Sequence, residues 1–295
     1  MGIHDLKGSY VAIATPMLSN GEIDFSALER LVEFHVEHGT HGIVAVGTTG
    51  ESATLNVDEH ISVVEFIVKK TAGRLQVIAG TGANSTSEAI HLTKLASAVG
   101  VDACLLVVPY YNKPTQEGLY QHFKAIAEAV DVAQILYNVP GRTVLSMENT
   151  TVERLADFDN IIGIKDATGD MQSGADLIKR VTGKMTVLSG DDASALDLIK
   201  LGGKGNISVT ANILPRKMSE MCIAAVEGNL TVAEKINIEL AEINQQLFVE
   251  SNPIPVKWAL EKMNLIESGI RLPLTRLSKN HQAGLVKAMQ STGLL

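Results

Sequence analysis

The sequence lacks the features that would link the chain to nucleic acid, to a membrane or to secretion. It has 25 basic and 33 acidic residues, a formal net charge of −8 and no basic run, which argues against nucleic acid and anionic membrane surfaces as partners. No apolar run approaches the length of a membrane span, and residues 1–10 contain no apolar signal segment. We therefore expect a soluble cytoplasmic protein.

Cysteine is scarce, and no group of residues has the spacing of metal ligands. The two cysteines, Cys104 and Cys222, stand in apolar segments, which predicts buried free thiols in a reducing compartment. The eight histidines show no metal-ligand spacing along a helix face. We expect neither a metal nor another cofactor.

The sequence does contain a repeat of strand-like and helix-like segments. Eight short apolar runs recur along a chain of 295 residues, of which 45% are hydrophobic. The runs lie at residues 10–14, 42–46, 76–79, 103–108, 133–137, 161–165, 185–188 and 205–209. Helical periodicity occupies the segments between them, for example at 116–130 and 216–227. Strand then helix, repeated eight times, predicts an α/β fold of the (β/α)₈ TIM barrel class.

Helix start signals and the end of the repeat give further structural predictions. Three helices are expected to begin at capping patterns, formed by Ser26 with Glu29, Asn56 with Glu59, and Ser85 with Glu88. After residue 228 the pattern is purely helical, over residues 230–249, 254–263 and 279–289. We therefore predict a catalytic barrel over residues 1–228 and appended C-terminal helices over residues 229–295.

A doubly wound open sheet is the alternative architecture. It would need a glycine-rich phosphate-binding turn after an early strand. The nearest match, at residues 80–84, lacks the third glycine and a suitably placed acidic residue. Eight repeated units also suit a closed barrel better than an open sheet.

Lys165 ends an otherwise apolar strand, which is an unusual place for a lysine. Lysine is rarely buried without a partner or a purpose. A desolvated amine has a lowered pKa and can attack a carbonyl at neutral pH to form a Schiff base. From this residue alone, a lysine that reaches solvent or pairs with Asp166 is an equal alternative.

Polar residues concentrate where the predicted strands end, which is where a barrel of this class carries its active site. Three of the five tyrosines stand at two of these strand ends, on the same rim as Lys165. The segments are Gly47-Thr48-Thr49-Gly50-Glu51, Gly80-Thr81-Gly82, Pro109-Tyr110-Tyr111-Asn112, Tyr137-Asn138-Val139-Pro140-Gly141-Arg142 and Ser189-Gly190-Asp191-Asp192.

Each rim residue also has a purely structural interpretation. Thr48 and Thr49 can cap a helix, or their amides and hydroxyls can bind a small carboxylate. A rim tyrosine can pack, or can shuttle protons beside a Schiff base. Arg142 can be a solvated loop residue, or its guanidinium can bind a substrate carboxylate. Asp192 can cap the following helix, and we do not expect it to form a metal site with Asp191.

In this order along the chain, the motifs resemble the dihydrodipicolinate synthase family of pyruvate-dependent, class I aldolase-like barrels. The resemblance covers essentially the whole chain, including residues 189–192 and 252–257. The GTTGE and YNxP patterns are shared across the superfamily, which includes N-acetylneuraminate lyase. The arginine after the YNVPG turn, together with the double tyrosine, is typical of the synthases.

The resemblance implies a cofactor-free lyase of the diaminopimelate route of lysine biosynthesis. Pyruvate would form a Schiff base with Lys165, and its enamine would attack L-aspartate 4-semialdehyde. The matching residues are Thr48, Tyr111 and Tyr137 for a proton relay, Thr49, Gly190 and the backbone around Ile207 for the pyruvate pocket, and Arg142 for the carboxylate of the semialdehyde.

The resemblance also implies assembly and regulation. Family members form dimers, usually doubled to tetramers, in which the residue matching Tyr111 reaches the neighbouring subunit's site. Many are inhibited by L-lysine at a dimer interface. The matching residues here are Ser52, Ala53, Leu55, His60, Asn84, Glu88 and Tyr110. Val57 stands where sensitive enzymes carry histidine, and one lost hydrogen bond there would weaken lysine binding by about 1–2 kcal/mol.

Two other functions stay open at this point. A sister lyase or aldolase would use the same lysine on a sugar-derived aldehyde, such as a sialic acid or a keto-deoxy sugar acid. Arg142 and the Tyr110-Tyr111 pair argue against this, because a sugar partner needs hydroxyl-binding groups more than an arginine. A non-catalytic barrel that binds small acids is the alternative from another class, and an intact lysine with three relay residues argues against it.

Overall fold

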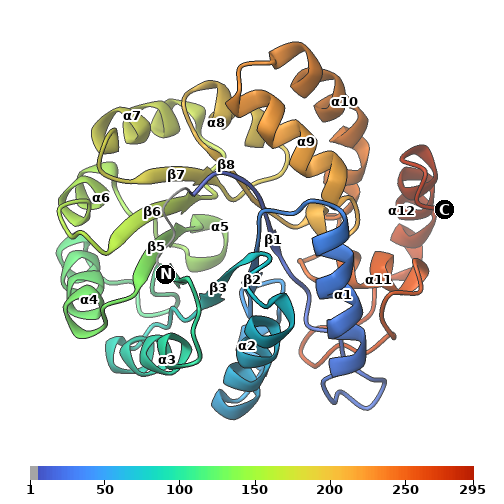
Figure 1. Ribbon diagram of the computed structural model, residues 1–295, viewed down its shortest axis with the longest axis horizontal. Helices are drawn as coiled ribbons and strands as arrows, with labels where there is room; N and C mark the ends of the chain where they lie inside the picture. Colours follow the sequence, from blue (N-terminus) through green and yellow to red (C-terminus); the bar gives the residue numbers. More distant parts are fainter. Residues whose placement is uncertain (1–5) are drawn as a thin grey trace.

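Eight parallel strands form the centre of the molecule. They are β1 (Gly8–Ala12), β2 (Gly42–Ala45), β3 (Gln76–Gly80), β4 (Ala103–Val107), β5 (Ala133–Asn138), β6 (Ile161–Asp166), β7 (Thr186–Ser189) and β8 (Gly205–Ser208). The structure, a computed structural model, describes residues 6–295. The strands close into a barrel in chain order, because β1 pairs with both β2 and β8 (Figure 1). The predicted TIM barrel is confirmed.

The helices form a layer around this barrel (Figure 1). They are α1 (Phe25–Glu37), α2 (Val57–Thr71), α3 (Thr86–Ala98), α4 (Gln116–Ala129), α5 (Pro140–Thr143), α6 (Asn149–Leu155), α7 (Met171–Val181), α8 (Ala195–Lys200) and α9 (Pro215–Val226). Two short 3-10 helices, η1 (Ser52–Thr54) and η2 (Thr210–Asn212), follow β2 and β8.

Two of the three predicted helix starts are confirmed. Asn56 and Glu59 make a full capping box on α2, and the Ser85 hydroxyl accepts from the Glu88 amide at the start of α3. The prediction for α1 is wrong, because Asp24 is the N-cap and accepts from the Ala27 amide at 2.9 Å. A bridge between residues 17 and 23, with the Asp24 amide bonded to the Pro16 carbonyl, places Asp24 at the helix entry.

The barrel interior is a packed apolar core. Inward-pointing side chains from alternate strand positions fill it, among them Tyr10, Val44 and Ile135. The same cluster reaches Tyr137 and Val139, which also line the cavity described below. The interior of the barrel is therefore filled by side chains, and the cavity lies beyond them, at the carboxyl ends of the strands.

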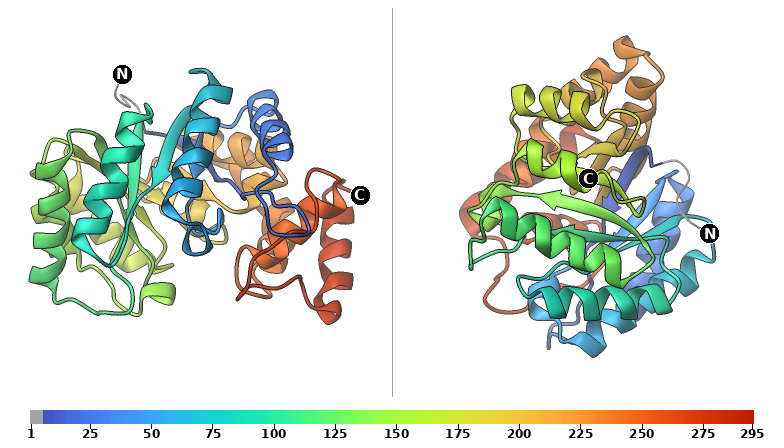
Figure 2. Two further views of the ribbon diagram at one scale, coloured as in Figure 1. Left: turned by 90° about the horizontal axis from the view of Figure 1, so that it is seen from below. Right: turned by 90° about the vertical axis from the view of Figure 1, so that its left-hand side faces the viewer.

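Three helices follow the barrel and pack on one side of it. They are α10 (Leu230–Gln246), α11 (Ile254–Lys262) and α12 (Lys279–Ser291), and Figure 2 shows α11 and α12 beside the barrel. Leu240 of α10 and Trp258 of α11 belong to the same buried cluster as Val11 and Val46 of the barrel. The helices share that core, and the division at residues 228/229 stays a prediction.

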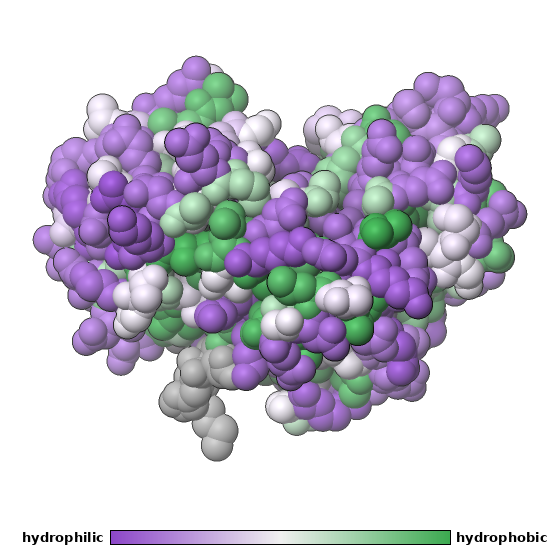
Figure 3. Space-filling view, turned by 90° about the horizontal axis from the view of Figure 1, so that it is seen from above, coloured by the Kyte–Doolittle hydropathy of each residue, from purple (hydrophilic) through white to green (hydrophobic). Residues whose placement is uncertain are grey.

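The surface is mostly polar on the face drawn in Figure 3, where hydrophobic residues gather mainly near the middle. Among the helices of residues 6–295, none combines the length and the apolar character that a membrane crossing requires.

Candidate active site

A cavity of about 380 Å³ lies at the carboxyl ends of the strands. Most of the rim residues singled out from the sequence meet there, although they come from five different strand ends. The predicted site residues that line it are Thr48, Thr49, Tyr137, Arg142, Lys165 and Gly190.

Lys165 lies inside this cavity with its amine free. It is the fifth residue of β6, in register with Tyr137 of β5, and only 5% of it is exposed. Its Nζ lies 4.4 Å from the centroid of the Tyr137 ring. Within residues 6–295 the amine has no hydrogen-bond or ion-pair partner. A buried amine without a counterion, beside a phenol, fits a nucleophile with a proton donor at hand.

Asp166 does not pair with Lys165, so that alternative is wrong. Successive residues of a strand point to opposite faces. The Asp166 carboxylate instead accepts from the Thr168 amide at 3.0 Å. Burial raises the pKa of this carboxyl, and the bond to Thr168 opposes the rise.

Gly190 forms the cavity wall next to the lysine. A Cβ at this position would lie 2.7 Å from Cε of Lys165 and 2.8 Å from Cβ of Ala167. Only glycine therefore leaves the lysine side chain in its observed place.

The turn after β2 presents free donors to the cavity. Within the turn, the Glu51 amide bonds to the Thr48 carbonyl at 3.1 Å, and the Ser52 amide bonds to the Gly47 carbonyl at 3.3 Å. In the described part of the chain, the amides of Thr48 and Thr49 make no hydrogen bond. Unpaired amides beside two hydroxyls can bind a carboxylate.

Arg142 stands at the cavity's edge on the short helix α5. The residue is exposed, and its Nη2 donates to the Asn252 carbonyl at 3.1 Å. This single contact leaves other guanidinium donors available for an anion.

Tyr111 and Ile207 do not line this cavity. Tyr111 is 91% exposed and has a positive φ of 75°. Ile207 is 1% exposed inside the barrel, and the residue of this segment that borders the cavity is Val209. Their proposed roles stay predictions.

Asp191 and Asp192 have separate structural contacts. Asp191 accepts from the amide and hydroxyl of Ser194 at 3.1 and 2.5 Å. Asp192 accepts from the Asn206 side chain and from the amides of Val209 and Thr210, so it binds the end of β8 and does not cap α8. Residues 6–295 contain no cluster of three or more side chains that could hold a metal ion.

A second cavity of about 360 Å³ adjoins the first, and Thr48, Arg142 and Asn252 line both. It contains six of the seven residues matched to the lysine site, namely Ser52, Ala53, Leu55, His60, Glu88 and Tyr110. Asn84, the seventh, does not line it but donates to the Tyr110 carbonyl at 3.2 Å.

Burial shifts the pKa of two side chains that line this second cavity. It raises the pKa of the Tyr110 phenol, and the charge of Glu88 adds to that effect. It lowers the pKa of His60, whose Nε2 lies 2.8 Å from the Gly80 carbonyl. Val57, at 38% exposure, also lines this cavity at the first position of α2.

Residues 5–292 match the model of the dihydrodipicolinate synthetase family. The chain belongs to this family. The 4-hydroxy-tetrahydrodipicolinate synthase of Pseudomonas putida is 60% identical over 290 residues, which cover 98% of this chain and 99% of the relative. That of Marinobacter nauticus is 59% identical over 291 residues, covering 98% and 100%.

Solved structures of the family superpose over the whole chain. The chloride-inhibited dihydrodipicolinate synthase of Acinetobacter baumannii, complexed with pyruvate, is 56% identical with a TM-score of 0.98 and covers 99% of this chain and 100% of its own. A lysine-bound enzyme of this family from Cyanidioschyzon merolae is 38% identical with a TM-score of 0.95, covering 98% and 99%. The resemblance found in the sequence is thereby confirmed for family and activity.

Four polar residues in and around the turn after β2 were given no functional role in the sequence analysis. One of them, Glu51, lies in the loop between β2 and α2, and the other three contact that loop, namely Asn252, Lys257 and Arg271. Lys257 did carry a usable signal, because it stands in an apolar helical segment just as Lys165 stands in an apolar strand.

Proposed function

We propose that the protein is a 4-hydroxy-tetrahydrodipicolinate synthase that condenses pyruvate with L-aspartate 4-semialdehyde through a Schiff base on Lys165. The observation that carries this assignment is the buried, unpaired Lys165 amine beside the Tyr137 ring in the barrel-end cavity. The activity agrees with that of the full-length relatives.

The first half of the reaction uses pyruvate alone. The Lys165 amine attacks the C2 carbonyl, and the carbinolamine loses water to give the imine. Loss of a methyl proton then gives the enamine. Tyr137, Thr48 and the Tyr111 of a second copy would carry these protons, while the free amides of residues 48 and 49 would hold the pyruvate carboxylate.

The second half forms the ring. The enamine carbon attacks the aldehyde carbon of the semialdehyde, and the aldehyde oxygen takes a proton to become the hydroxyl. The amine of the semialdehyde then attacks the imine carbon and displaces Lys165, which closes the ring. Arg142 would hold the second substrate's carboxylate at the cavity's edge.

We also propose that the protein works as a homo-oligomer, a dimer of dimers, and that the second cavity binds L-lysine as an inhibitor. The exposed Tyr111 and the lining of the second cavity support these proposals. The buried free thiols of Cys104 and Cys222 favour a reducing compartment such as the cytoplasm.

The test combines trapping with a substrate panel. Pyruvate with borohydride should add a reduced pyruvyl group to Lys165, located by peptide mass spectrometry. A coupled assay should then give turnover with L-aspartate 4-semialdehyde and none with sugar aldehydes. Labelling at another residue, or preferred turnover of a sugar aldehyde, would contradict the assignment.

A further inference from the structure

A buried ion pair lies behind the substrate-binding turn. Lys257 of α11 donates to the Glu51 carboxylate, and the two side chains are 4% and 0% exposed. Glu51 ends the turn that carries Thr48 and Thr49, and its φ of 57° is left-handed, which is uncommon for a residue with a side chain. The second Glu51 oxygen accepts from the Arg271 amide at 3.2 Å.

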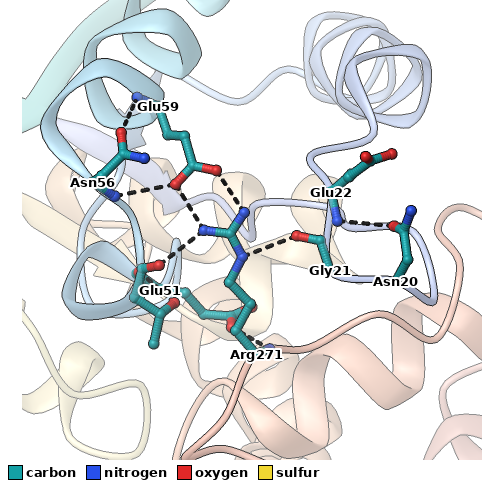
Figure 4. Close-up of polar contacts among 8 residues, drawn as sticks. Asn20, Gly21, Glu22, Glu51, Asn56, Glu59 and Arg271 are labelled. Carbon is teal, nitrogen blue, oxygen red and sulfur yellow. Dashed lines mark hydrogen bonds and ion pairs between the residues drawn. The ribbon is translucent and has the colours of Figure 1, made fainter.

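The Arg271 side chain contacts the same loop closer to the start of α2 (Figure 4). Its guanidinium donates to both oxygens of Glu59 at 2.8 and 2.6 Å, and to the Thr54 carbonyl at 2.8 Å. Its Nε donates to the Gly21 carbonyl at 2.9 Å. The loop from Glu51 to Glu59 is therefore held at both ends by the C-terminal segment.

Asn252 contacts the site directly. Its Nδ2 donates to Thr49 Oγ1 at 3.0 Å, and its backbone carbonyl accepts from Arg142. Because Asn252 donates to the Thr49 oxygen, the Thr49 hydroxyl proton is free to bond to a carboxylate in the cavity. Asn252 is 5% exposed and lines both cavities.

Stability alone does not explain the buried ion pair. Two charges removed from water give little net stabilisation, and apolar replacements of similar volume are often neutral or better. Burial indeed lowers the pKa of Lys257, an effect that Glu51 opposes. The pair does fix the backbone geometry of the turn, because it holds Glu51 in a strained left-handed conformation at the end of the turn.

We propose that Lys257 and Asn252 are positioning residues for pyruvate: through Glu51 and Thr49 they hold the turn after β2 in the geometry that binds the substrate carboxylate. The C-terminal helices thus form part of the substrate site although they supply no reacting group. This inference rests on the proposed function, since it assigns the turn to the pyruvate carboxylate.

The test measures the pyruvate concentration that gives half-maximal borohydride labelling of Lys165, together with the thermal midpoint of unfolding. Lys257→Met leaves a buried unpaired carboxylate and should lower the midpoint strongly. The double variant Glu51→Gln/Lys257→Met removes both charges and should regain most of the midpoint. Its half-maximal pyruvate concentration should stay about 10- to 100-fold above wild type, because the turn is no longer held.

Asn252→Leu provides a second, independent arm that keeps the ion pair. It should raise the half-maximal pyruvate concentration about 10-fold, with a much smaller change in kcat at saturating pyruvate. Arg276→Met is the matched control, because it breaks an exposed ion pair with Glu261 in the same segment and touches no part of the turn. It should leave pyruvate labelling unchanged.

The outcomes separate three cases. If the double variant regains both its midpoint and wild-type pyruvate labelling, the pair is merely structural and the inference is overturned. The same holds if Asn252→Leu labels like wild type. If wild-type Lys165 itself takes no pyruvyl label, the proposed function fails first and the inference fails with it.

Discussion

Lys165 and Lys257 are both buried, but their amines have different neighbours. Lys257 faces the Glu51 carboxylate, whereas the Lys165 amine lies 4.4 Å from the centroid of the Tyr137 ring and has no carboxylate partner within residues 6–295. An amine engaged in a buried ion pair is held by a charge and a fixed geometry. An amine without such a partner has no ion pair to break before it attacks a carbonyl. These contacts support the proposed roles, in which Lys257 positions the turn and Lys165 is the nucleophile.

The fit between Gly190 and Lys165 gives a prediction at the residue scale. Gly190→Ala should slow pyruvate labelling of Lys165 by about 100-fold, because the new methyl would displace the lysine side chain. Borohydride trapping over time measures the rate, and a thermal scan verifies folding. Gly141→Ala on the same rim is the control, because its Cβ would meet nothing within 4 Å. Equal labelling rates for both variants would refute the steric argument.

Arg142 gives a second residue-scale prediction. Arg142→Ala should lower kcat/KM for L-aspartate 4-semialdehyde by about 10- to 100-fold, because a charge-assisted bond to the substrate carboxylate is lost. Pyruvate labelling of Lys165 should change little. Arg142→Lys keeps the charge but lacks the planar guanidinium. Its kcat/KM for L-aspartate 4-semialdehyde should lie between those of wild type and Arg142→Ala. A parallel loss of labelling and turnover would show that Arg142 does not serve the second substrate specifically.

At the scale of elements, the connection from β2 to α2 borders both cavities. Thr48 and Ser52 line each of them, and η1 with the start of α2 lies along the second. A ligand in the second cavity would therefore touch the loop whose other end we propose to hold the substrate carboxylate. We propose that this shared loop couples the two cavities.

Val57 at the start of α2 allows this coupling to be tested. Val57→His should lower the L-lysine concentration for half-maximal inhibition by about 5- to 30-fold, because the imidazole restores one hydrogen bond in the second cavity. A lysine titration of the coupled assay measures it, with Asp58→Asn at the neighbouring position as the control. If lysine leaves both wild type and Val57→His fully active, the second cavity is not an inhibitor site.

At the scale of the whole molecule, one predicted relay residue lies outside the site of its own chain. Tyr111 is 91% exposed and has a left-handed backbone, so in a single chain it contributes nothing to the cavity around Lys165. Aromatic residues with a polar tip suit interfaces, and a two-fold dimer would place two such tyrosines symmetrically.

Mixing two inactive variants tests this arrangement. Lys165→Ala lacks the nucleophile and Tyr111→Phe lacks the phenol, yet a mixed dimer would contain one site with both. After subunit exchange, activity should rise toward about a quarter of the wild-type value, as random pairing into two-fold dimers predicts. Each variant exchanged with itself is the control. Mixed dimers without any gain in activity would show that Tyr111 does not act across the interface.

The amino-acid sequence by itself determined the barrel and the rim on which its chemistry lies. Strand and helix periodicities are local patterns, so eight repeats predicted eight strands, and each observed strand overlaps a predicted run. Parallel strands end on one side of a barrel, which is why Lys165, Tyr137 and Thr48 were expected to meet. The α1 start was predicted wrongly, because a bridge formed before the helix selected Asp24 over Ser26.

Only the tertiary structure decided which of these residues share a cavity and what holds them. Lys257 and Glu51 are 206 residues apart, and no local pattern relates a lysine to a carboxylate at that distance. The same limit applies to Asn252 and Thr49, 203 residues apart. Sequence spacing specifies which element a residue joins, whereas the partner of a buried charge depends on how the elements pack. For this protein, that packing gives Lys257 a buried carboxylate partner and leaves the Lys165 amine without one within residues 6–295.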